Sequence, residues 1–410
     1  MKKASIVTIG NEILSGKTVD TNAAHLAIEL QNIGIPVVSS YTVSDEIEHI
    51  VHALKLAGSD ADIIVATGGL GPTDDDLTRQ AFAEFLSVEL QLQNDLLEKI
   101  RERFAQRNIE MPENNKIQAY IPTGAKALEN IGTAPGILAE YEGKLFIALP
   151  GVPMEMKQMF ESVLPELKKF AGGQAVFVRR LKCFGAGEST IAEMIGDMMQ
   201  RDRNPLINCT ASSGIITLHI IAEANEQNEA QKMAEQDEKF LRETLGELIY
   251  GVEDQTLAEV VGEKLARHKK TIAVAESCTG GWLAKLITDV PGASEYFTYG
   301  WITYSNQAKI SELGVSAGLI EKYGAVSEQV AEAMAHGARN KAGTDFAIGI
   351  TGIAGPTGGT EQKPVGLVYI SMASEKDCET KRCLFIHRRD FTRLRAAQTA
   401  LNMLRLKLND

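Results

Sequence analysis

The sequence has few cysteines and no long apolar run. Its five cysteines form no Cys-x-x-Cys pair and no spacing typical of a metal site; they are Cys183, Cys209, Cys278, Cys378 and Cys383. Cysteines without such pairing indicate a protein of a reducing compartment, where thiols stay free. No apolar run reaches the ~18–20 residues that a membrane helix requires. The first apolar run, Ala4–Ile9, stops at Gly10 and is too short for a secretory signal. We therefore expect a cytoplasmic protein that does not contact a membrane.

Positive charge is also in deficit. The chain has 42 Lys and Arg against 54 Asp and Glu, which gives a formal net charge of −12. Nonspecific nucleic-acid binders rely on clustered positive charge, so this balance argues against direct nucleic-acid binding. The apolar content of 44% is ordinary for a globular protein, and 410 residues exceed what one core usually serves. Two or three domains are expected.

The alternation of strand and helix patterns divides the chain into three parts. Over residues 1–170, buried strand patterns such as Ile63–Thr67 alternate with helix patterns such as Ile47–Ala57, which indicates a mainly parallel sheet. Residues 171–250 predict a small α+β connector of KH-like type, expected to be structural because no basic patch is evident. Residues 251–410 alternate again. The predicted fold class is therefore α/β, with a doubly wound N-terminal domain, the connector and a C-terminal α/β domain.

In the C-terminal third, the most informative segment is Thr271–Gly281, TIAVAESCTGG. An apolar strand pattern stops at Glu276, and a helical pattern begins at Trp282. A hydroxyl on such a turn is exposed beside backbone N–H groups without intrahelical partners, and these can stabilise an oxyanion. Ser277 is therefore a candidate nucleophile. The alternative is that Ser277 and Thr279 only cap the helix.

A second segment, Tyr299–Lys309, supplies a candidate base. Tyr304 and Lys309 stand five residues apart after another strand-like run. Serine needs a base, and a lysine made neutral by desolvation can serve where no histidine is near. A solvated cation is the alternative interpretation of Lys309. Cys278, beside the serine, is expected to be a buried and inert thiol.

The sharpest N-terminal feature is a glycine-rich loop followed by three aspartates, TGGLGPTDDDLT over Thr67–Thr78. Glycines let the backbone approach a ligand, and N–H groups at the following helix start favour a phosphate. The carboxylates of Asp74–Asp76 would repel that phosphate unless a divalent cation intervened, and hard oxygen ligands suit Mg²⁺ or Mn²⁺. A solvated acidic turn, with Asp76 as a helix cap, is the alternative.

These motifs stand in an order that resembles a known family. From about Gly251 to Leu408 the chain resembles the PncC-type nicotinamide-nucleotide amidohydrolases. The matching pieces are Ala275–Gly281, Tyr304–Lys309, Gly324–Glu328, Thr351–Pro356 with Gly358 and Gly359, and Pro364–Gly366. The upstream part is similar to the molybdopterin-binding-like domain of the competence/damage-inducible CinA family. Its matching pieces are Gly10–Gly16, Asp20–Asn22, Thr67–Thr78, Gly132–Gly136 and Leu149–Met156. The resemblance to the CinA family covers nearly the full length.

The resemblance implies that the C-terminal domain deamidates nicotinamide mononucleotide without a cofactor. It implies Ser277 as nucleophile, Lys309 as general base and Tyr304 as a residue that positions or relays the proton. The glycine-rich loop Gly352–Gly359 would bind the substrate phosphate. The substrate-binding residues implied for this domain are Thr279, Gly280, Gly281, Thr351, Gly352, Gly355, Arg389 and Arg393.

For the N-terminal domain the resemblance implies metal-dependent hydrolysis of ADP-ribose rather than molybdenum chemistry. The implied phosphate-binding residues are Gly68, Gly69, Gly71, Thr73, Thr78 and Asn11. The implied ligands of a divalent cation of the Mg²⁺ or Mn²⁺ class are Asp75, Asp76 and Glu155, with Glu12 and Asp20 as second candidates. Together the two activities would serve salvage of pyridine nucleotides, and a homodimer is expected.

One run departs from the family pattern. The family carries Phe-x-Gly-Asp-Arg before the last helix, whereas this chain has His387 and Arg388 in place of Gly-Asp. Arg389 and Arg393 are retained, and His387 is expected to be a turn residue rather than a base. The substitution leaves open a regulatory or partner-binding CinA-like protein with one site weakened. A molybdopterin-handling enzyme is a third hypothesis, against which the deamidase-like half argues.

Overall fold

The computed structural model describes residues 2–129, 132–171, 175–385 and 388–409. The chain forms two compact units. One consists of residues 1–178 and 222–233, and the other of residues 179–221 and 234–410. Each is described by itself. Among the helices described, none is both long and apolar enough to cross a bilayer.

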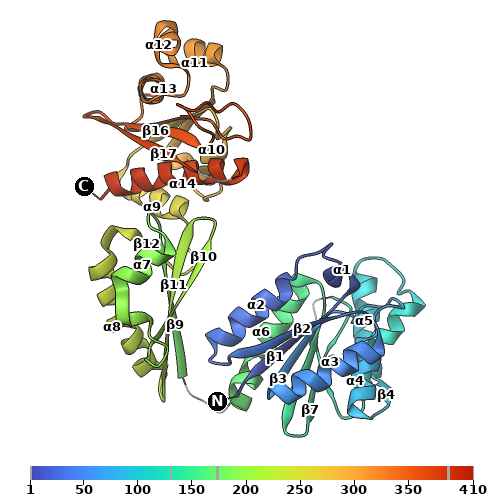
Figure 1. The fold of residues 1–410 in the computed structure, drawn as a ribbon. Coiled ribbons are helices and arrows are strands. Elements are labelled where there is room, and N and C mark those ends of the chain that lie inside the picture. The colour runs from blue at the N-terminus through green and yellow to red at the C-terminus, as the bar shows by residue number, and fades with distance from the viewer. Residues whose placement is uncertain (1, 130–131, 172–174, 386–387, 410) are drawn as a thin grey trace. The chain divides into compact units, whose positions relative to one another are not determined.

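A six-stranded sheet in the order β2-β1-β3-β8-β7-β6 forms the centre of the N-terminal domain (Figure 1). Its strands are β1 (Ala4–Ile9), β2 (Val37–Val43), β3 (Ile63–Thr67), β6 (Lys126–Leu128), β7 (Gly136–Tyr141) and β8 (Lys144–Leu149). The four strands β2, β1, β3 and β8 are parallel, and β7 and β6 continue the sheet antiparallel. The predicted mainly parallel sheet is therefore present, with an antiparallel extension.

Helices cover both faces of this sheet because successive strand residues point to opposite sides. Ile6 of β1 packs in one cluster with Leu26 and Phe160, and Val7 in another with Ile50 and Phe82. The first face carries α2 (Thr21–Asn32) and α6 (Pro153–Ala171). The second carries α3 (Ile47–Asp60), α4 (Thr78–Leu86) and α5 (Asn94–Gln106). Further short elements are α1 (Asn11–Leu14), β4 (Leu90–Leu92), η1 (Glu113–Ala119) and β5 (Tyr120–Pro122).

The connector is built on a four-stranded sheet in the order β10-β11-β9-β12. The strands are β9 (Ala175–Cys183), β10 (Leu206–Ser212), β11 (Ile215–Ala224) and β12 (Ile249–Val252). Its helical segments are α7 (Glu188–Ile195), η2 (Gly196–Met199), α8 (Gln227–Leu245) and η3 (Gly246–Leu248). The predicted α+β connector is confirmed.

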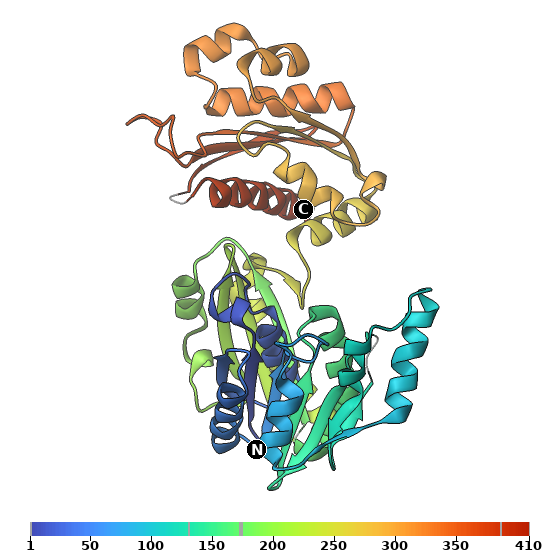
Figure 2. The same cartoon turned by 90° about the vertical axis from the view of Figure 1, so that its right-hand side faces the viewer.

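The C-terminal domain has three layers around a five-stranded sheet in the order β14-β13-β15-β16-β17. Its strands are β13 (Ile272–Glu276), β14 (Phe297–Ile302), β15 (Phe346–Gly352), β16 (Leu367–Ala373) and β17 (Cys378–Leu384). The first three strands are parallel and the last two antiparallel. Helices α11 (Asn306–Leu313), α12 (Ala317–Tyr323) and α13 (Glu328–Ala342) lie on one side (Figure 2). Helices α9 (Leu257–His268), α10 (Trp282–Thr288) and α14 (Arg389–Lys407), with η4 (Ala293–Glu295), lie on the other.

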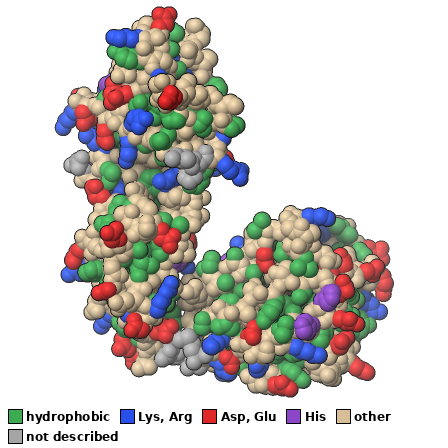
Figure 3. All heavy atoms as spheres, in the orientation of Figure 1, with side chains coloured by type: hydrophobic (Ala, Val, Ile, Leu, Met, Phe, Trp, Pro, Cys, Tyr) green, Lys and Arg blue, Asp and Glu red, His purple; other side chains and the backbone are tan. Residues whose placement is uncertain are grey.

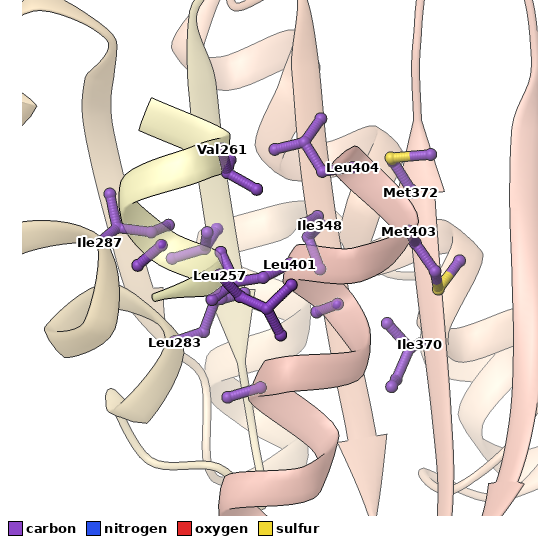
Figure 4. Close-up of a cluster of buried hydrophobic side chains, with 14 of the residues drawn as sticks. Leu257, Val261, Leu283, Ile287, Ile348, Ile370, Met372, Leu401, Met403 and Leu404 are labelled. Carbon is purple, nitrogen blue, oxygen red and sulfur yellow. The ribbon is translucent and has the colours of Figure 1, made fainter. Parts of the chain in front are cut away.

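A hydrophobic core packs α14 against the five-stranded sheet that carries the C-terminal site. Figure 4 shows Leu257 and Leu283 meeting Leu401 of α14, with Ile348 and Ile370 of the sheet behind them. Burial of such side chains contributes roughly 1.5–3 kcal/mol each. On the face drawn in Figure 3, acidic and basic side chains are interspersed over each domain.

Candidate active sites

The C-terminal site begins where β13 ends, on an interior strand of the sheet. β13 is fully buried between β14 and β15, and the Ser277 N–H donates to the Ile350 carbonyl at 3.0 Å. The chain then turns into α10. Ligands of open α/β sheets bind at the carboxyl ends of parallel strands, which is where Ser277 lies.

Lys309, on α11, lies against this serine. Its Nζ atom is 3.1 Å from Ser277 Oγ, 2.9 Å from the Thr303 carbonyl and 3.4 Å from the Tyr304 carbonyl. Only 1% of its surface is exposed, and Ser277 is 8% exposed. Burial lowers the pKa of Lys309, and the neighbouring Cys278 thiol opposes this in part. The lysine is therefore a desolvated amine in contact with a hydroxyl.

The carboxylate of Glu276 caps α10. It accepts hydrogen bonds from the N–H groups of Gly281, Leu283 and Ala284 at 2.8–3.1 Å. The helix start is thus occupied by a side chain of the protein itself. These N–H groups were expected to face a substrate, but they bind Glu276 instead. The sequence did not predict this role of Glu276.

Two other amides of the turn remain available. The Gly280 N–H donates back to the Ser277 carbonyl at 3.1 Å. The N–H groups of Cys278 and Thr279 donate to no other residue in the described part of the chain, and the Cys278 N–H interacts with its own thiol. Burial raises the pKa of the Cys278 thiol to about 12, so this thiol is protonated at neutral pH.

Arg393 of α14 holds the turn from outside. Its Nε and Nη2 donate to the Thr279 carbonyl at 3.1 and 2.7 Å, and its guanidinium lies over the Trp282 ring. Gly280 has φ +60°, and a Cβ there would lie 3.1 Å from Arg393 Nη2. The geometry makes Arg393 a support of the turn, whereas the sequence suggested a substrate contact.

Tyr304 lies at the mouth of the site and is 61% exposed. Its hydroxyl accepts from Arg389 at 3.2 Å, and Arg389 also donates to the Gly355 carbonyl at 2.7 Å. Among the described residues, no hydrogen bond joins the Tyr304 hydroxyl to Ser277 or Lys309. His387 lies outside the described residues.

The remaining predicted residues of this domain support the wall of the site. The Thr351 hydroxyl is buried and donates to the Ala325 carbonyl at 2.8 Å. Gly352 closes β15, and Gly355 contributes the carbonyl that accepts from Arg389.

The N-terminal site is a cavity of about 410 Å³ at the carboxyl ends of β1, β3 and β8. The glycine loop, with Gly68, Gly69, Gly71 and Thr73, lines it. So do five carboxylate residues, namely Glu12, Asp45, Asp75, Asp76 and Glu155. Asn11 and Thr78 are not part of this lining. The sequence-predicted metal ligands therefore share one cavity with the phosphate loop.

Asp45 is a member of the cavity that sequence reasoning missed. Burial raises its pKa, the Asn11 N–H lowers it by donating to the carboxylate, and the charges of Glu12, Asp75 and Asp76 raise it further. The available signal was its position just after β2, which neighbours β1 in the sheet.

The aspartates of the loop are partly engaged by Thr73. Asp76 accepts from the Thr73 N–H at 2.9 Å and from its hydroxyl at 2.6 Å, and the hydroxyl also lies 2.5 Å from Asp75. Thr73 lowers the pKa of Asp75. Among the described residues, no group of three His, Cys, Asp or Glu side chains converges to hold a metal ion.

Two further residues that the sequence predicted for this site, Asp20 and Thr78, form hydrogen bonds with nearby backbone groups. Asp20 caps α2 by accepting from the Ala23 N–H at 2.8 Å. Thr78 is fully buried, and its hydroxyl donates to the Gly68 carbonyl at 2.7 Å. The structure thus places Thr78 behind the loop rather than facing the cavity.

Three family models match the chain. "Probable molybdopterin binding domain" matches residues 5–169, "Damage-inducible protein CinA KH domain" matches 178–251, and "CinA C-terminal domain" matches 254–408. These matches follow one another along the chain, as the three parts of the fold do.

Relatives match over the full length. A protein of Caldicellulosiruptor bescii named competence-damage inducible protein is 43% identical over 409 residues, 99% of each chain. A protein of the same name from Clostridium beijerinckii is 44% identical over 406 residues, 98% of each chain. A CinA-like protein of Dictyoglomus thermophilum is 42% identical over 405 residues, again 98% of each chain.

Proposed function

The chain belongs to the family of CinA-like, competence-damage inducible proteins, and we propose that it is a hydrolase of pyridine nucleotides with two sites. The C-terminal site deamidates nicotinamide mononucleotide, and the N-terminal site hydrolyses the diphosphate of ADP-ribose. The observation that carries the proposal is the buried contact between Ser277 and Lys309.

The surroundings of Lys309 suit a neutral amine. A neutral amine has two N–H bonds and one lone pair. The carbonyls of Thr303 and Tyr304 can accept the two N–H bonds, which leaves the lone pair for the Ser277 hydroxyl. Burial of Lys309, with no carboxylate paired to it among the described residues, favours this uncharged form. Lys309 is thereby suited to act as the general base.

The proposed reaction proceeds through an acyl-enzyme. Ser277 Oγ attacks the carboxamide carbon while its proton passes to Lys309. The C–N bond then breaks, and Lys309 returns the proton to the leaving nitrogen, which departs as ammonia. Water attacks the resulting ester, its proton passes to Lys309, and the Ser277 oxygen leaves with that proton, which releases the carboxylic acid.

The turn after the serine suits the negative charge that develops on the carboxamide oxygen. The N–H groups of Cys278 and Thr279 donate to no other residue in the described part of the molecule. Arg393 fixes the peptide that follows Thr279 by binding its carbonyl. Amides held in place before the reaction stabilise an oxyanion without reorganisation. At the mouth, Arg389 is a cation suited to the substrate phosphate.

The N-terminal proposal rests on the chemistry of the cavity. Carboxylates are the hard oxygen ligands that Mg²⁺ and Mn²⁺ prefer. Burial raises the pKa of Asp45, and the negative charges of Glu12, Asp75 and Asp76 raise it further. Asp75, Asp76 and Glu155 would hold the cation, which would neutralise the charge of the diphosphate. The amides of the glycine loop would bind the phosphate oxygens.

Product analysis by mass spectrometry tests both assignments. Purified protein is incubated with nicotinamide mononucleotide or ADP-ribose, each with Mg²⁺, with Mn²⁺ or with chelator. We expect nicotinate mononucleotide and ammonia under all conditions, and AMP with ribose 5-phosphate only when metal is present. Unchanged nicotinamide mononucleotide would favour a regulatory role for the C-terminal domain. Bound pterin would favour the molybdopterin alternative.

A further inference from the structure

A fully buried arginine lies behind the glycine loop of the N-terminal site. Arg79, the second residue of α4, has 0% of its surface exposed. Its Nη1 donates to the Leu70 carbonyl at 2.7 Å and its Nη2 to the Gly71 carbonyl at 2.5 Å. Its Nε is buried and has no partner within the described ranges. Arginine is almost never fully buried without a paired charge, so this position calls for a function beyond packing.

Arg79 and Thr78 together bind four successive carbonyls of the loop, those of residues 68–71. The Thr78 hydroxyl donates to Gly68 at 2.7 Å and the Thr78 N–H to Gly69 at 3.1 Å, while Arg79 binds the next two carbonyls. A Cβ at Gly69 would lie 2.4 Å from Thr78 Oγ1, so this close approach requires glycine.

The direction of the carbonyls sets the direction of the amides. In a trans peptide, the C=O of one residue and the N–H of the next point in opposite directions. The N–H groups of Gly69, Leu70 and Gly71 therefore point away from Thr78 and Arg79, on the side where the loop lines the cavity. They have no acceptor among the described residues, and Pro72 has no N–H to add. Successive amides in this arrangement form an anion-binding concavity.

The negative charge around the cavity would repel a phosphate unless a positive charge lay nearby. Five carboxylate residues line it, and the described lining includes no lysine or arginine. Burial lowers the pKa of Arg79 to about 10, with Asp76 opposing the shift, so the guanidinium is charged at neutral pH. This charge lies directly behind the peptides whose amides face the cavity.

We propose that Arg79 is a positioning residue of the N-terminal site. It turns the amides of Gly69, Leu70 and Gly71 toward the cavity and supplies the buried positive charge that lets the loop bind a diphosphate. The inference rests on the proposed hydrolysis of a diphosphate at this site.

Binding of ADP in the presence of Mg²⁺, measured by calorimetry on the full chain, tests the role of Arg79. Arg79→Met keeps the approximate volume and removes both the charge and the carbonyl contacts. Arg79→Lys keeps the charge but cannot bind both carbonyls as a planar fork does. We expect affinity to fall at least ~30-fold in Arg79→Met and clearly less in Arg79→Lys, with larger losses for ADP than for the less charged AMP.

Arg405→Met is the matched control. Arg405 is also buried and donates to the Glu247 carbonyl and to Asn402, but it belongs to the other compact unit. Its loss should leave ADP affinity unchanged. Thermal unfolding confirms that each variant is folded. If Arg79→Met does not fold, a loss of at least ~5-fold in folded Arg79→Lys supports the proposal, and wild-type affinity there overturns it.

Parallel assays of ADP-ribose hydrolysis separate this inference from the proposed function. Wild-type ADP affinity in Arg79→Met would overturn the inference even if the protein hydrolyses ADP-ribose. Equal losses in the Lys and Met variants would overturn the role of the charge. Wild-type protein that binds ADP through Arg79 but leaves ADP-ribose intact would refute the hydrolase proposal and keep the inference. Absence of ADP binding to wild type would refute both.

Discussion

The Nζ atom of Lys309 lies 3.1 Å from the Oγ atom of Ser277, although the two residues are 32 positions apart in the sequence. Their contact depends on the pairing of β13 with β14, because the strand ends place Ser277 and the segment before α11 side by side. Lys309 is buried there against backbone carbonyls. This contact underlies the predictions for the C-terminal site.

Lys309 should make activity and stability depend on pH. The base must be neutral, so the deamidation rate should rise with pH and level off above the folded pKa of Lys309, which burial places below the ordinary 10.5. Between the folded and unfolded pKa values the unfolded chain binds more protons, so the unfolding free energy rises with pH in that window. Lys309→Met should remove this rise. Denaturant unfolding of both proteins across the window checks it, and parallel curves would contradict it.

Tyr304→Phe separates positioning from proton relay. The Tyr304 hydroxyl contacts Arg389, so its removal should raise KM for nicotinamide mononucleotide by less than ~10-fold and change kcat little. A relay in the chemical step would instead cost ~10²–10⁴-fold in kcat. Steady-state kinetics decide between the two roles, and a kcat loss in that range would restore the relay that the sequence suggested.

Asp76→Ala should cut ADP-ribose hydrolysis by at least ~10²-fold, because it removes a carboxylate from the cavity that we assign to the cation. Asp74→Ala is the matched control. Asp74 belongs to the same acidic run but does not line the cavity, so its rate should stay within ~2-fold of wild type. Equal losses in both variants, or full wild-type activity in excess chelator, would contradict the metal assignment.

The two activities should fail independently. Ser277 and the Gly68–Gly71 loop lie in different compact units, so Ser277→Ala and Lys309→Ala should leave ADP-ribose hydrolysis near wild type. Because the two residues act as one unit, the double variant should deamidate nicotinamide mononucleotide hardly more slowly than either single variant. Loss of both activities in a folded Ser277→Ala protein would refute the division into two sites.

Local sequence patterns were sufficient to predict the strands that carry both sites. The apolar runs Ile63–Thr67 and Thr271–Ala275 stop at glycine-rich or hydroxyl-rich turns. They correspond to the buried interior strands β3 and β13. β17 was not predicted, because Cys378–Leu384 is a mostly polar edge strand that depends on pairing with β16. Its neighbours in space, rather than its own residues, determine its structure.

The chemical details of the sites were harder to predict, because they depend on contacts that local patterns do not encode. The sequence pattern places Glu276 at the end of a strand, and only the fold shows that its carboxylate caps α10. Arg79 follows the acidic run as an ordinary helix residue, yet its guanidinium folds back under the loop. Asp45 reaches the cavity only because β2 lies beside β1.

Ammonia release from nicotinamide mononucleotide by Ser277→Ala is the most direct test of the C-terminal assignment. Ser311→Ala is the matched control, since Ser311 is an exposed residue of α11 outside the site. We predict that wild type and Ser311→Ala release ammonia at equal rates, while Ser277→Ala is slower by at least ~10³-fold and remains folded. Substantial ammonia release by Ser277→Ala would contradict the serine nucleophile and point to a water activated by Lys309.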